Sequence, residues 1–437
     1  MKISVIGCGY LGAVHAASMA KLGHDVVGVD TDATKISTLQ AGIAPFYEPG
    51  LPELLSETLA TGKLRFTSSM ADVQESEVHF VCVGTPQKSG EYAADVQYVD
   101  AAFDALLPYL QPGSVAVGKS TVPVGTAARI AQRLSSASPK SHLVWNPEFL
   151  REGHAVSDTL QPDRFVYGIA DDESGLTAAK CLDKVYEQAL EANTPRLIVN
   201  YATAELVKSA ANSFLATKIS FINAMAEVCD ASGADVAQLA DAIGMDDRIG
   251  RKFLNAGIGF GGGCLPKDIR AFMARAGELG ADQALSFLRE VDAINMRRRS
   301  RVVEMVRELC GGSLIGKRLT VLGATFKPNS DDVRDSPALS IAAQLQLQGA
   351  TVTVSDPQGL VNAAKRFPEL KYEADVDTAL TNANAVLLLT EWDDFTQLDP
   401  ESVGLLVDDK IMLDGRNILD SEKWKLNGWS YRGIGRM

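Results

Sequence analysis

At 437 residues the chain is too long for one ordinary hydrophobic core, and its length indicates two or three domains. Hydrophobic residues make up 46% of it and charged residues 22%, which is typical of a soluble globular protein, and no run approaches the roughly 20 apolar residues of a membrane span. The net charge of -13 argues against nucleic acid as a partner, because a phosphate backbone requires a basic surface.

The six cysteines show no spacing typical of a zinc site, a redox pair or a disulfide framework. We therefore expect no bound metal. The first residues lead directly into an apolar strand, with no pattern of a signal peptide. We therefore expect a cytoplasmic protein without a membrane partner.

The first strand, turn and helix carry a dinucleotide-binding fingerprint. An apolar strand at residues 2–6 precedes the turn Gly7-Cys8-Gly9-Tyr10-Leu11-Gly12, and a helical pattern follows at residues 13–22. In this motif the glycines permit a tight turn, the approach of a pyrophosphate and close packing of the helix. The order of strand, turn and helix therefore predicts a bound dinucleotide.

The second strand, residues 25–30, ends in Asp30, 18 residues after Gly12. A carboxylate at this point is suited to accept hydrogen bonds from the adenosine ribose and to repel a 2′-phosphate, which favours NAD over NADP. The nearby Lys35 leaves NADP open as an alternative.

Two further apolar strands, at residues 78–83 and 114–119, end in polar turns that contain Thr85 and Thr121. A ligand of an open parallel sheet lies beyond the carboxyl ends of the strands, so we expect both turns to line the cofactor site. The alternative is that they are ordinary turns between strand and helix.

The run from Val144 to Gly153 contains Asn146-Pro147, which predicts a helix cap and a first helical position. A short helical turn would then place Glu148 and Glu152 on one face, where repulsion could raise the pKa of one carboxyl enough to hold or shuttle a proton. A solvated acidic helix face is the competing interpretation.

Apolar residues recur at helical spacing from Ala202, and no proline interrupts them, so a helix of at least 25 residues is predicted there. Such a helix is long enough to join two domains and to bury a stripe against a partner subunit. Lys208 and Asn212 share one face of it. Because Lys208 interrupts a largely apolar run, we expect its amine to be partly desolvated and placed to bind or relay charge; a solvent-facing lysine is the alternative.

Cys264 lies in the run Gly259-Phe260-Gly261-Gly262-Gly263-Cys264-Leu265-Pro266-Lys267-Asp268. The glycines leave the backbone without side chains, so another molecule could approach the sulfur. Pro266 suits the first position of a new helix, which places Cys264 just before a helix N-terminus, beside Lys267, where a thiolate is favoured. We therefore predict a reaction centre at Cys264; the alternative is a buried structural cysteine.

Beyond Gly311-Gly312, strands at residues 318–323, 351–356, 385–390 and 411–414 alternate with helical segments and predict a second α/β layer structure. Its first turn lacks the glycine fingerprint, so we expect no second dinucleotide. The cations Lys327, Arg334 and Arg416 instead suit a ligand phosphate.

Together, these motifs resemble those of the UDP-glucose/GDP-mannose dehydrogenase family. The resemblance covers nearly the whole chain, and it rests on the first fingerprint and on the segments at residues 146–153, 208–212, 247–250, 259–268 and 326–337. It implies two Rossmann-like doubly wound domains joined by a long central helix. The expected regions are 1–200 for NAD, 201–300 for dimerisation and catalysis, and 301–437 for the UDP-sugar.

The resemblance also implies an activity: NAD-dependent, four-electron oxidation of UDP-glucose to UDP-glucuronate through a thiohemiacetal and a thioester on a cysteine. The run Cys-Leu-Pro-Lys-Asp is shared with GDP-mannose 6-dehydrogenases, so the sugar and base stay open. The partners implied are UDP-glucose and a second copy of the chain in a homodimer. A two-electron β-hydroxyacid dehydrogenase is a second possibility, although it needs neither Cys264 nor the last third of the chain, and a non-enzymatic NAD-sensing module is a third.

Residue roles follow from the resemblance, position by position. The implied catalytic residues are Cys264 as nucleophile, with Lys208, Asn212, Asp268, Glu148, Glu152 and Thr121. The implied cofactor site contains Gly7, Gly9, Leu11, Gly12, Asp30, Lys35, Thr85, Thr121, Glu152, Lys267 and Arg334. The implied substrate site contains Glu148, Phe149, Leu150, Arg151, Glu152, Lys208, Asn212, Phe253, Leu254, Asn255, Ala256, Gly257, Gly261, Lys327 and Arg416, with Arg248 reaching the substrate of the neighbouring subunit.

Overall fold

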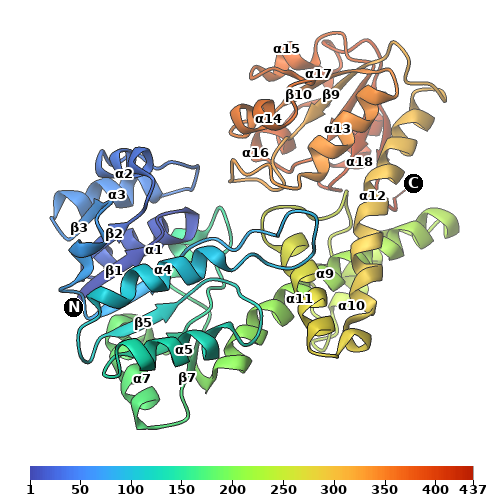
Figure 1. Cartoon of the computed structure of the whole chain (residues 1–437). Helices are drawn as coiled ribbons and strands as arrows, with labels where there is room; N and C mark the ends of the chain where they lie inside the picture. The colour runs from blue at the N-terminus through green and yellow to red at the C-terminus, as the bar shows by residue number, and fades with distance from the viewer. Residues whose placement is uncertain (437) are drawn as a thin grey trace. The chain divides into compact units, whose positions relative to one another are not determined.

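The computed structural model describes residues 1–436, and the chain forms two compact units (Figure 1). Unit 1 contains residues 1–211 and 270–280, and unit 2 contains residues 212–269 and the rest of the described chain from residue 281. The chain crosses between the units three times; the first two crossings fall inside helices, α9 (Tyr201–Ser232) and α11 (Leu265–Glu278), and the third follows the end of α11. Each of these helices therefore carries residues of both units.

The sheet of unit 1 has the strand order β3-β2-β1-β4-β5-β6-β7-β8. The strands from β3 through to β6 are parallel, and β7 joins β6 in the antiparallel direction. Their bounds are β1 (Lys2–Ile6), β2 (Asp25–Val29), β3 (Leu64–Thr67), β4 (Val78–Val81), β5 (Val115–Gly118), β6 (His142–Trp145), β7 (Phe165–Ile169) and β8 (Arg196–Asn200). Chain order reverses between β1 and β4, which is where a ligand binds in sheets of this kind.

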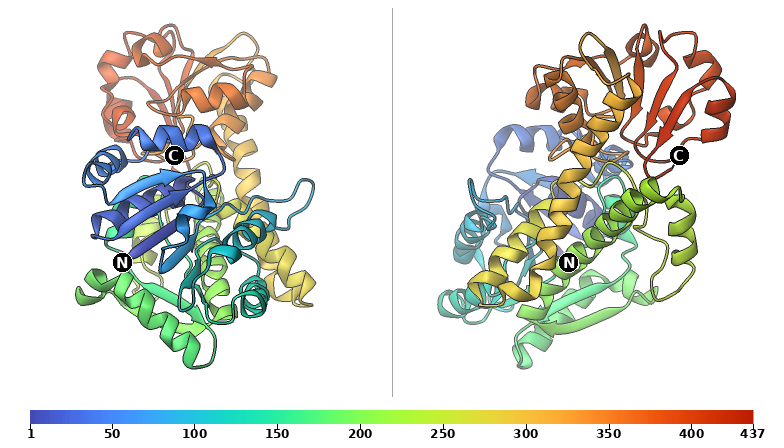
Figure 2. Two further views of the ribbon diagram at one scale, coloured as in Figure 1. Left: turned by 60° about the vertical axis from the view of Figure 1, so that its left-hand side comes forward. Right: turned by 90° about the vertical axis from the view of Figure 1, so that its right-hand side faces the viewer.

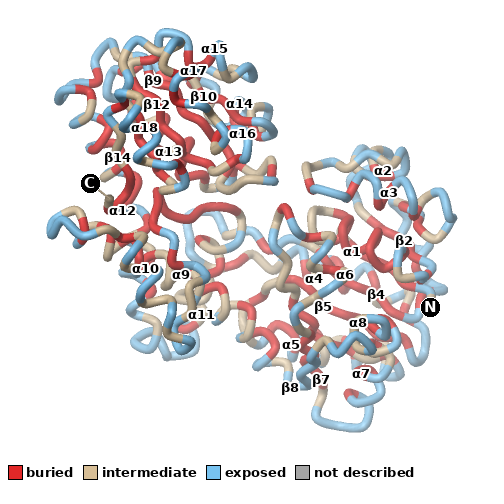
Figure 3. The backbone as a smooth tube through the Cα atoms, turned by 180° about the vertical axis from the view of Figure 1, so that it is seen from behind, coloured by how far each residue is buried: buried red, intermediate tan, exposed pale blue. Residues whose placement is uncertain are grey.

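Helices cover both faces of this sheet, and each face has its own hydrophobic core, so the central strands are drawn as buried in Figure 3. On one face lie α1 (Tyr10–Lys21), α3 (Leu51–Ala60), α6 (Ala155–Leu160) and α7 (Glu173–Val185). On the other lie α4 (Gln97–Leu106) and α5 (Thr126–Ala137). Helices α2 (Ala33–Gln40) and α8 (Glu187–Glu191) also contribute side chains to the first of these cores.

The sheet of unit 2 is parallel throughout, in the order β11-β10-β9-β12-β13-β14. The strands are β9 (Arg318–Leu322), β10 (Thr351–Ser355), β11 (Lys371–Tyr372), β12 (Ala385–Leu388), β13 (Ile411–Asp414) and β14 (Ser430–Gly433). The helices that follow them are α13 (Pro337–Leu347), α14 (Leu360–Arg366), α15 (Val376–Leu380), α16 (Asp393–Thr396), α17 (Pro400–Val403) and α18 (Ser421–Leu426).

Helices that precede this sheet in the chain share its hydrophobic core. They are the second half of α9, α10 (Val236–Gly244) and α12 (Phe287–Leu309). Helix α9 has 32 residues. The right-hand view of Figure 2 shows it as one unbroken helix. The prediction of two Rossmann-like sheets with a long central helix is therefore confirmed. The expected region boundary at residue 300 falls inside α12, and the division into three regions stays a prediction.

The predicted helical turn at Asn146-Pro147 is wrong, because no helix forms between the end of β6 at Trp145 and the start of α6 at Ala155. Asn146 does not cap a helix. It is buried, and its side-chain nitrogen donates to the carbonyl of Val166 at 3.0 Å. The segment leaves the strand without helical structure, so Glu148 and Glu152 do not share a helical face.

Two properties of the described residues bear on ligands and membranes. Within residues 1–436, no group of three or more histidine, cysteine, aspartate or glutamate side chains could hold a metal ion. A search of the described helices finds none with the length and apolar character required to span a bilayer.

Candidate active site

The glycine turn after β1 leaves open space at Gly9. Gly7 has a φ of +88°, and a Cβ there would lie 2.7 Å from Val83. A Cβ on Gly12 would lie 1.8 Å from the carbonyl oxygen of Gly7, so α1 packs directly on the turn. A Cβ on Gly9 would meet no atom within 4 Å. The turn therefore fits a pyrophosphate approaching at Gly9, at the N-terminus of α1.

Asp30 stands at the end of β2 and reaches back to this turn. Its carboxylate accepts hydrogen bonds from the Cys8 amide at 2.8 Å and from the Lys35 ammonium at 2.9 Å. Burial acts to raise the pKa of Asp30, but hydrogen bonds from Lys35 and from nearby amides hold that pKa below its ordinary value. Lys35 is therefore engaged with the carboxylate proposed to select the ribose.

The turns after β4 and β5 lie together, because the two strands are neighbours in the sheet. The Thr85 hydroxyl donates to the carbonyl of Thr121 at 2.8 Å, and the Ser120 hydroxyl donates to that of Val83 at 2.6 Å. Beyond them, the buried carboxylate of Glu205 on α9 accepts from the Ala127 amide at 2.6 Å, at the start of α5. Helix α9 is thus tied to the segment that contains Thr121.

Glu148 and Lys208 form an ion pair of 3.0 Å inside unit 1. Lys208 is 5% exposed, in agreement with the expected desolvation, and its ammonium also lies 5.6 Å from the centre of the Phe149 ring. Glu148 accepts a further hydrogen bond from the Leu150 amide at 2.6 Å. The pair places a cation and a carboxylate next to each other, and each can hold or move a proton there.

The residues after Glu148 are held by partners distant in sequence. The guanidinium of Arg151 pairs with Asp158 at 2.6 Å, which directs Arg151 to the surface of α6. Glu152 is half-buried, and its charge contributes to a raised pKa of Tyr10, of which burial is the main cause. Glu48, also buried, accepts from the Gly153 amide at 2.7 Å and so fixes the chain just after Glu152.

In unit 2, Cys264 is exposed and immediately precedes α11, as predicted. Its carbonyl oxygen accepts from the Asp268 amide at 2.9 Å, so Cys264 stands at the capping position of the helix. The buried carboxylate of Asp268 accepts from the side chain of Asn212 at 2.6 Å and from Lys267 at 2.7 Å. An exposed sulfur at a positive helix end is thus followed by a buried carboxylate with two donors.

The glycines before Cys264 serve to pack this loop against residues 326–335. A Cβ on Gly261 would lie 2.3 Å from the carbonyl oxygen of Asp335, and one on Gly262 would lie 2.8 Å from the Phe326 ring. A Cβ on Gly263 would lie 2.3 Å from the guanidinium of Arg334. The glycine run predicts that another group approaches the backbone closely. At Gly261, Gly262 and Gly263 that group is another part of the chain itself.

Several predicted substrate residues meet in unit 2. The space beside Gly257 is bounded by the carbonyl oxygen of Gly415 and by the side chain of Arg416. The Arg416 guanidinium donates to the carbonyls of Leu389 and Phe326 at 2.7 and 3.2 Å. The Lys327 ammonium lies 5.4 Å from the centre of the Phe326 ring. Phe253 begins the same segment with a φ of +66°. The segment continues through Leu254, Asn255 and Ala256.

Arg248 stands apart from this group. Its side chain is 88% exposed and pairs with Asp246 at 2.6 Å, in the turn after α10. Lys218 of α9 holds the same turn by donating to the carbonyls of Ile249 and Gly250 at 2.9 and 3.0 Å. The structure therefore fixes the backbone near Arg248 while leaving its guanidinium at the surface.

Three family models match consecutive parts of the chain. They describe the NAD binding domain (residues 1–190), the central domain (residues 202–297) and the UDP binding domain (residues 320–421) of the UDP-glucose/GDP-mannose dehydrogenase family. The chain belongs to this family. It is an oxidoreductase, and NAD is its cofactor. Membership excludes the non-enzymatic alternative and confirms the predicted dinucleotide.

Relatives extend this match over the full chain. A UDP-glucose 6-dehydrogenase of Rhizobium meliloti is 41% identical over 439 residues, covering 100% of both chains. The UDP-glucose 6-dehydrogenase TuaD of Bacillus subtilis is 40% identical, covering 100% of this chain and 93% of its own. The solved structure of a UDP-glucose dehydrogenase from Pyrobaculum islandicum superposes with a TM-score of 0.90 at 36% identity, covering 100% of this chain and 98% of its own.

In the second sheet an aspartate also follows the second strand, but its carboxylate is filled by hydrogen bonds from the protein itself. Asp356 follows β10 as Asp30 follows β2, and it is 3% exposed. Its carboxylate accepts six hydrogen bonds, from the amides of Ala324, Thr325, Gln358 and Gly359, the Thr325 hydroxyl and the Trp392 indole. A carboxylate offers about four lone-pair sites, so Asp356 has no capacity left for a ribose.

Sequence reasoning missed the buried polar residues that hold these segments. They are Glu48, Lys119, Tyr186, Glu205, Asn223, Asn295 and Arg298. Asn223 of α9 accepts from the Gly257 amide at 2.9 Å, and Asn295 of α12 accepts from the Phe260 amide at 2.8 Å. The only sign of these residues in the sequence is a single polar residue inside an otherwise apolar strand or helix. Such a residue does not show which distant group it contacts.

Proposed function

We propose that this enzyme oxidises the C6 hydroxyl of UDP-glucose to a carboxylate, with two NAD⁺ reduced for each sugar nucleotide, through a covalent intermediate on Cys264. The observation that carries the proposal is the exposed Cys264 at the start of α11, four residues before a buried Asp268 that accepts from Asn212 at 2.6 Å. The names of the relatives and the UDP binding domain support UDP-glucose as the substrate.

The proposed reaction removes two hydrides and adds one water. When bound, NAD⁺ supplies the hydride acceptor for each of the two oxidations. In the first, the C6 hydroxyl gives up its proton and C6 becomes an aldehyde. The sulfur of Cys264 then adds to the aldehyde carbon, and the oxygen takes a proton to give a thiohemiacetal. Loss of the second hydride, together with the hydroxyl proton, gives a thioester, which water hydrolyses to the carboxylate and the free thiol.

We assign the proton transfers to the buried polar groups. Lys208 and Asn212 stand one turn apart on α9, so both can stabilise negative charge that develops on the C6 oxygen. Asp268 holds Asn212 in place and, with a water, takes part in proton transfer. Glu148 orients the hydrolytic water, while Glu152 and Thr121 contact both the cofactor and the reacting sugar.

We assign the cofactor and the sugar nucleotide to separate groups of residues. The turn Gly7–Gly12 with Leu11, together with Asp30, Lys35, Thr85, Thr121, Glu152, Lys267 and Arg334, is proposed to bind NAD. The residues proposed to bind UDP-glucose are Glu148 to Glu152, Lys208, Asn212, Phe253 to Gly257, Gly261, Lys327 and Arg416. Arg248 is proposed to reach the substrate of a second copy of this chain in a homodimer.

The experiment measures NADH formed for each sugar nucleotide consumed. UDP-glucose is expected to give about two NADH, and GDP-mannose and UDP-N-acetylmannosamine much slower turnover. Cys264→Ser is expected to abolish steady-state formation of the acid while NAD binding is retained, because a hydroxyl is a poor substitute for a thiolate nucleophile. Cys181→Ser, which changes a half-buried cysteine of α7, serves as the matched control. A Cys264→Ser enzyme that made the acid near the wild-type rate would rule out the covalent route.

A further inference from the structure

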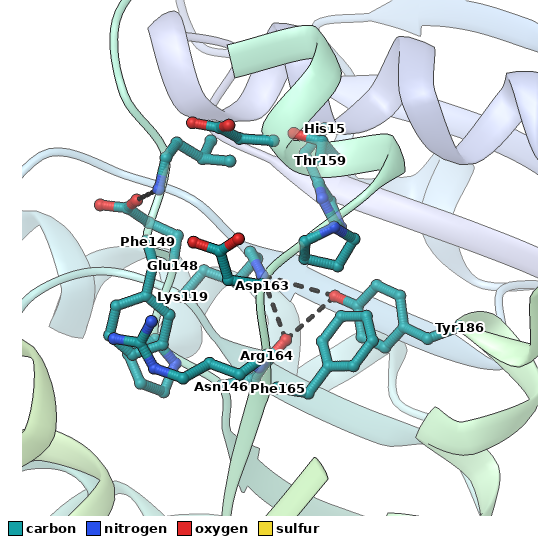
Figure 4. A pocket seen from close by; sticks show the side chains of 14 residues that line it. His15, Lys119, Asn146, Glu148, Phe149, Thr159, Asp163, Arg164, Phe165 and Tyr186 are labelled. Atoms are coloured by element: carbon teal, nitrogen blue, oxygen red, sulfur yellow. Dashed lines mark hydrogen bonds between the residues drawn. The ribbon is translucent and has the colours of Figure 1, made fainter. Parts of the chain in front are cut away.

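Lys119 is a buried lysine just beyond the end of β5 that no step above uses. It is 7% exposed, and its backbone amide donates to the carbonyl of Val81 at 3.0 Å. Its ammonium donates to the side-chain oxygen of Asn146 at 3.1 Å and to the hydroxyl of Tyr186 at 3.4 Å. The Tyr186 hydroxyl donates to the same Asn146 oxygen at 2.9 Å, so the three side chains form a closed triangle (Figure 4).

Both hydrogen-bond partners of the Lys119 ammonium are neutral. Among the described residues no carboxylate lies within 4.0 Å of it, and the rings of Phe80 and Tyr186 lie 5.8 and 5.9 Å away. A buried charge without an ion partner is costly, and burial lowers the pKa of Lys119 to about 8. Packing alone would be served better by an apolar side chain of the same length. The amine therefore points to a role in positioning its hydrogen-bond partners, Asn146 and Tyr186.

What Lys119 holds is the segment that carries Glu148. The Asn146 amide donates to the carbonyl of Gly118 at 2.8 Å, and its side-chain nitrogen donates to the carbonyl of Val166, so Asn146 is held by these two bonds and by the triangle. Glu148 follows two residues later and meets Lys208 at 3.0 Å. A cavity of about 50 Å³, lined by Lys119, Asn146, Glu148 and Tyr186 among others, lies beside this segment.

The cavity matters because it leaves Glu148 without protein packing on that side. Such a volume holds more than one water molecule and does not restrain a side chain. The position of the Glu148 carboxylate is then set by its backbone, by the hydrogen bond from the Leu150 amide and by its ion pair with Lys208. A shift of the backbone at Asn146 would therefore displace Glu148 directly.

We propose that Lys119 is a positioning residue for the oxidation: with Tyr186 it holds Asn146, and through Asn146 it places Glu148 against Lys208. This inference rests on the proposed function, since it assigns Glu148 and Lys208 to that reaction. Lys119 contacts neither the sugar nor the reacting carbon in this role. It acts by keeping Glu148 at the distance from Lys208 that proton transfer requires.

The charge of Lys119 adds a dependence on pH. The titratable groups that act on it are His15 of α1, Cys82 after β4, Tyr186 after α7, Glu148 and Lys208, and Asp158, Asp163 and Arg164 line the cavity beside it. Burial lowers the pKa of His15 and raises those of Cys82 and Tyr186, so these three stay neutral near pH 8. Lys119 is protonated below pH 8 and loses its charge above it. We expect kcat to decline as pH rises through that value.

The test compares kcat, KM and pH profile for UDP-glucose oxidation in four variants. Lys119→Met keeps the length of the side chain and removes the amine; kcat is expected to fall about tenfold or more, while KM for NAD⁺ stays within about twofold. Lys119→Arg keeps the charge above pH 8, so its decline in kcat is expected to move to higher pH. Tyr186→Phe removes one corner of the triangle and is expected to lower kcat several-fold. Lys180→Met, an exposed lysine of α7, is the matched control.

The outcomes separate this inference from the proposed function. If wild-type enzyme does not form two NADH from UDP-glucose, the proposed function fails. If it does, and Lys119→Met retains wild-type kcat with an unchanged pH profile, the positioning role is overturned. Should Lys119→Met fail to fold, Tyr186→Phe decides: wild-type kcat in that variant rejects the triangle as a positioning device.

Discussion

The side-chain nitrogen of Asn212 donates to the carboxylate of Asp268 across 2.6 Å, and both groups are buried. The two residues are 56 positions apart, one on α9 and the other in the first turn of α11, and both belong to unit 2. Because Asp268 also accepts from Lys267, its negative charge is shared between two donors. The contact joins the helix that carries Lys208 to the helix that begins after Cys264.

Replacing Asp268 by asparagine tests this contact. The amide would keep the shape of the side chain and lose the charge, so we expect Asp268→Asn to lower kcat by about 10²-fold, in the range of a lost acid–base group. Steady-state rates with UDP-glucose give the answer. Asp282→Asn, at an exposed aspartate of the 3-10 helix η3 (Asp282–Leu285), should leave kcat unchanged. Equal rates for the wild type and Asp268→Asn would remove Asp268 from the proton path.

The carboxylate of Asp30 should select NAD over NADP. Loss of its hydrogen bonds to the ribose costs about 1–3 kcal/mol. Asp30→Ala is therefore expected to lower kcat/KM for NAD⁺ about 10- to 100-fold, and so to reduce the difference between kcat/KM for NAD⁺ and for NADP⁺. Lys35→Ala separates the two candidates, since Lys35 pairs with Asp30 at 2.9 Å. The measurement is kcat/KM with each cofactor. If Lys35→Ala changes the preference and Asp30→Ala does not, Lys35 controls the selectivity.

The ion pair of Lys208 with Glu148 predicts a defect in the chemical step. Lys208→Ala removes a buried cation that stabilises charge only as it develops, so kcat should fall far more than KM for UDP-glucose rises. Lys184→Ala, at an exposed lysine in the last turn of α7, is the control. A variant whose only defect is a raised KM would assign Lys208 to substrate binding.

The role proposed for Arg248, contact with the substrate of a second copy of the chain, predicts an active site shared between two subunits; its guanidinium is exposed. Arg248→Ala and Cys264→Ala are each expected to be inactive, and mixing them under subunit exchange should restore activity. In a mixed dimer, the subunit with an intact Cys264 receives Arg248 from its partner, so one of the two sites is whole. Labelled subunits confirm the exchange. A mixture that exchanges and stays inactive shows that Arg248 serves its own subunit.

Local motifs could be predicted because all the residues that define each of them lie within one short segment of the sequence. The strand, glycine turn and Asp30 are read within the first 30 residues, and Pro266 alone predicts the start of α11 next to Cys264. The failure at Asn146 has a physical reason. Its side chain is satisfied by Lys119 and Tyr186, 27 and 40 residues away, so the local preference for a helix cap gave way to tertiary contacts.

The glycines before Cys264 show the same limit. Their number indicates close approach, but not by what, and the structure places the loop containing Phe326 and Arg334 against them. Buried partners such as Glu48 and Gly153, 105 residues apart, leave no periodic trace in the sequence. Contacts between residues this far apart in the sequence can be identified only from the folded structure.

The saturated carboxylate of Asp356 bears on the order of events in the proposed reaction. With the turn of the second sheet closed, the open glycine turn at Gly9 is the place the described chain offers for a dinucleotide. Two oxidations at one such place require NADH to depart and a fresh NAD⁺ to enter before the second can occur. The half-oxidised sugar must stay behind during that exchange, and a bond to Cys264 would tether it while the cofactor is replaced.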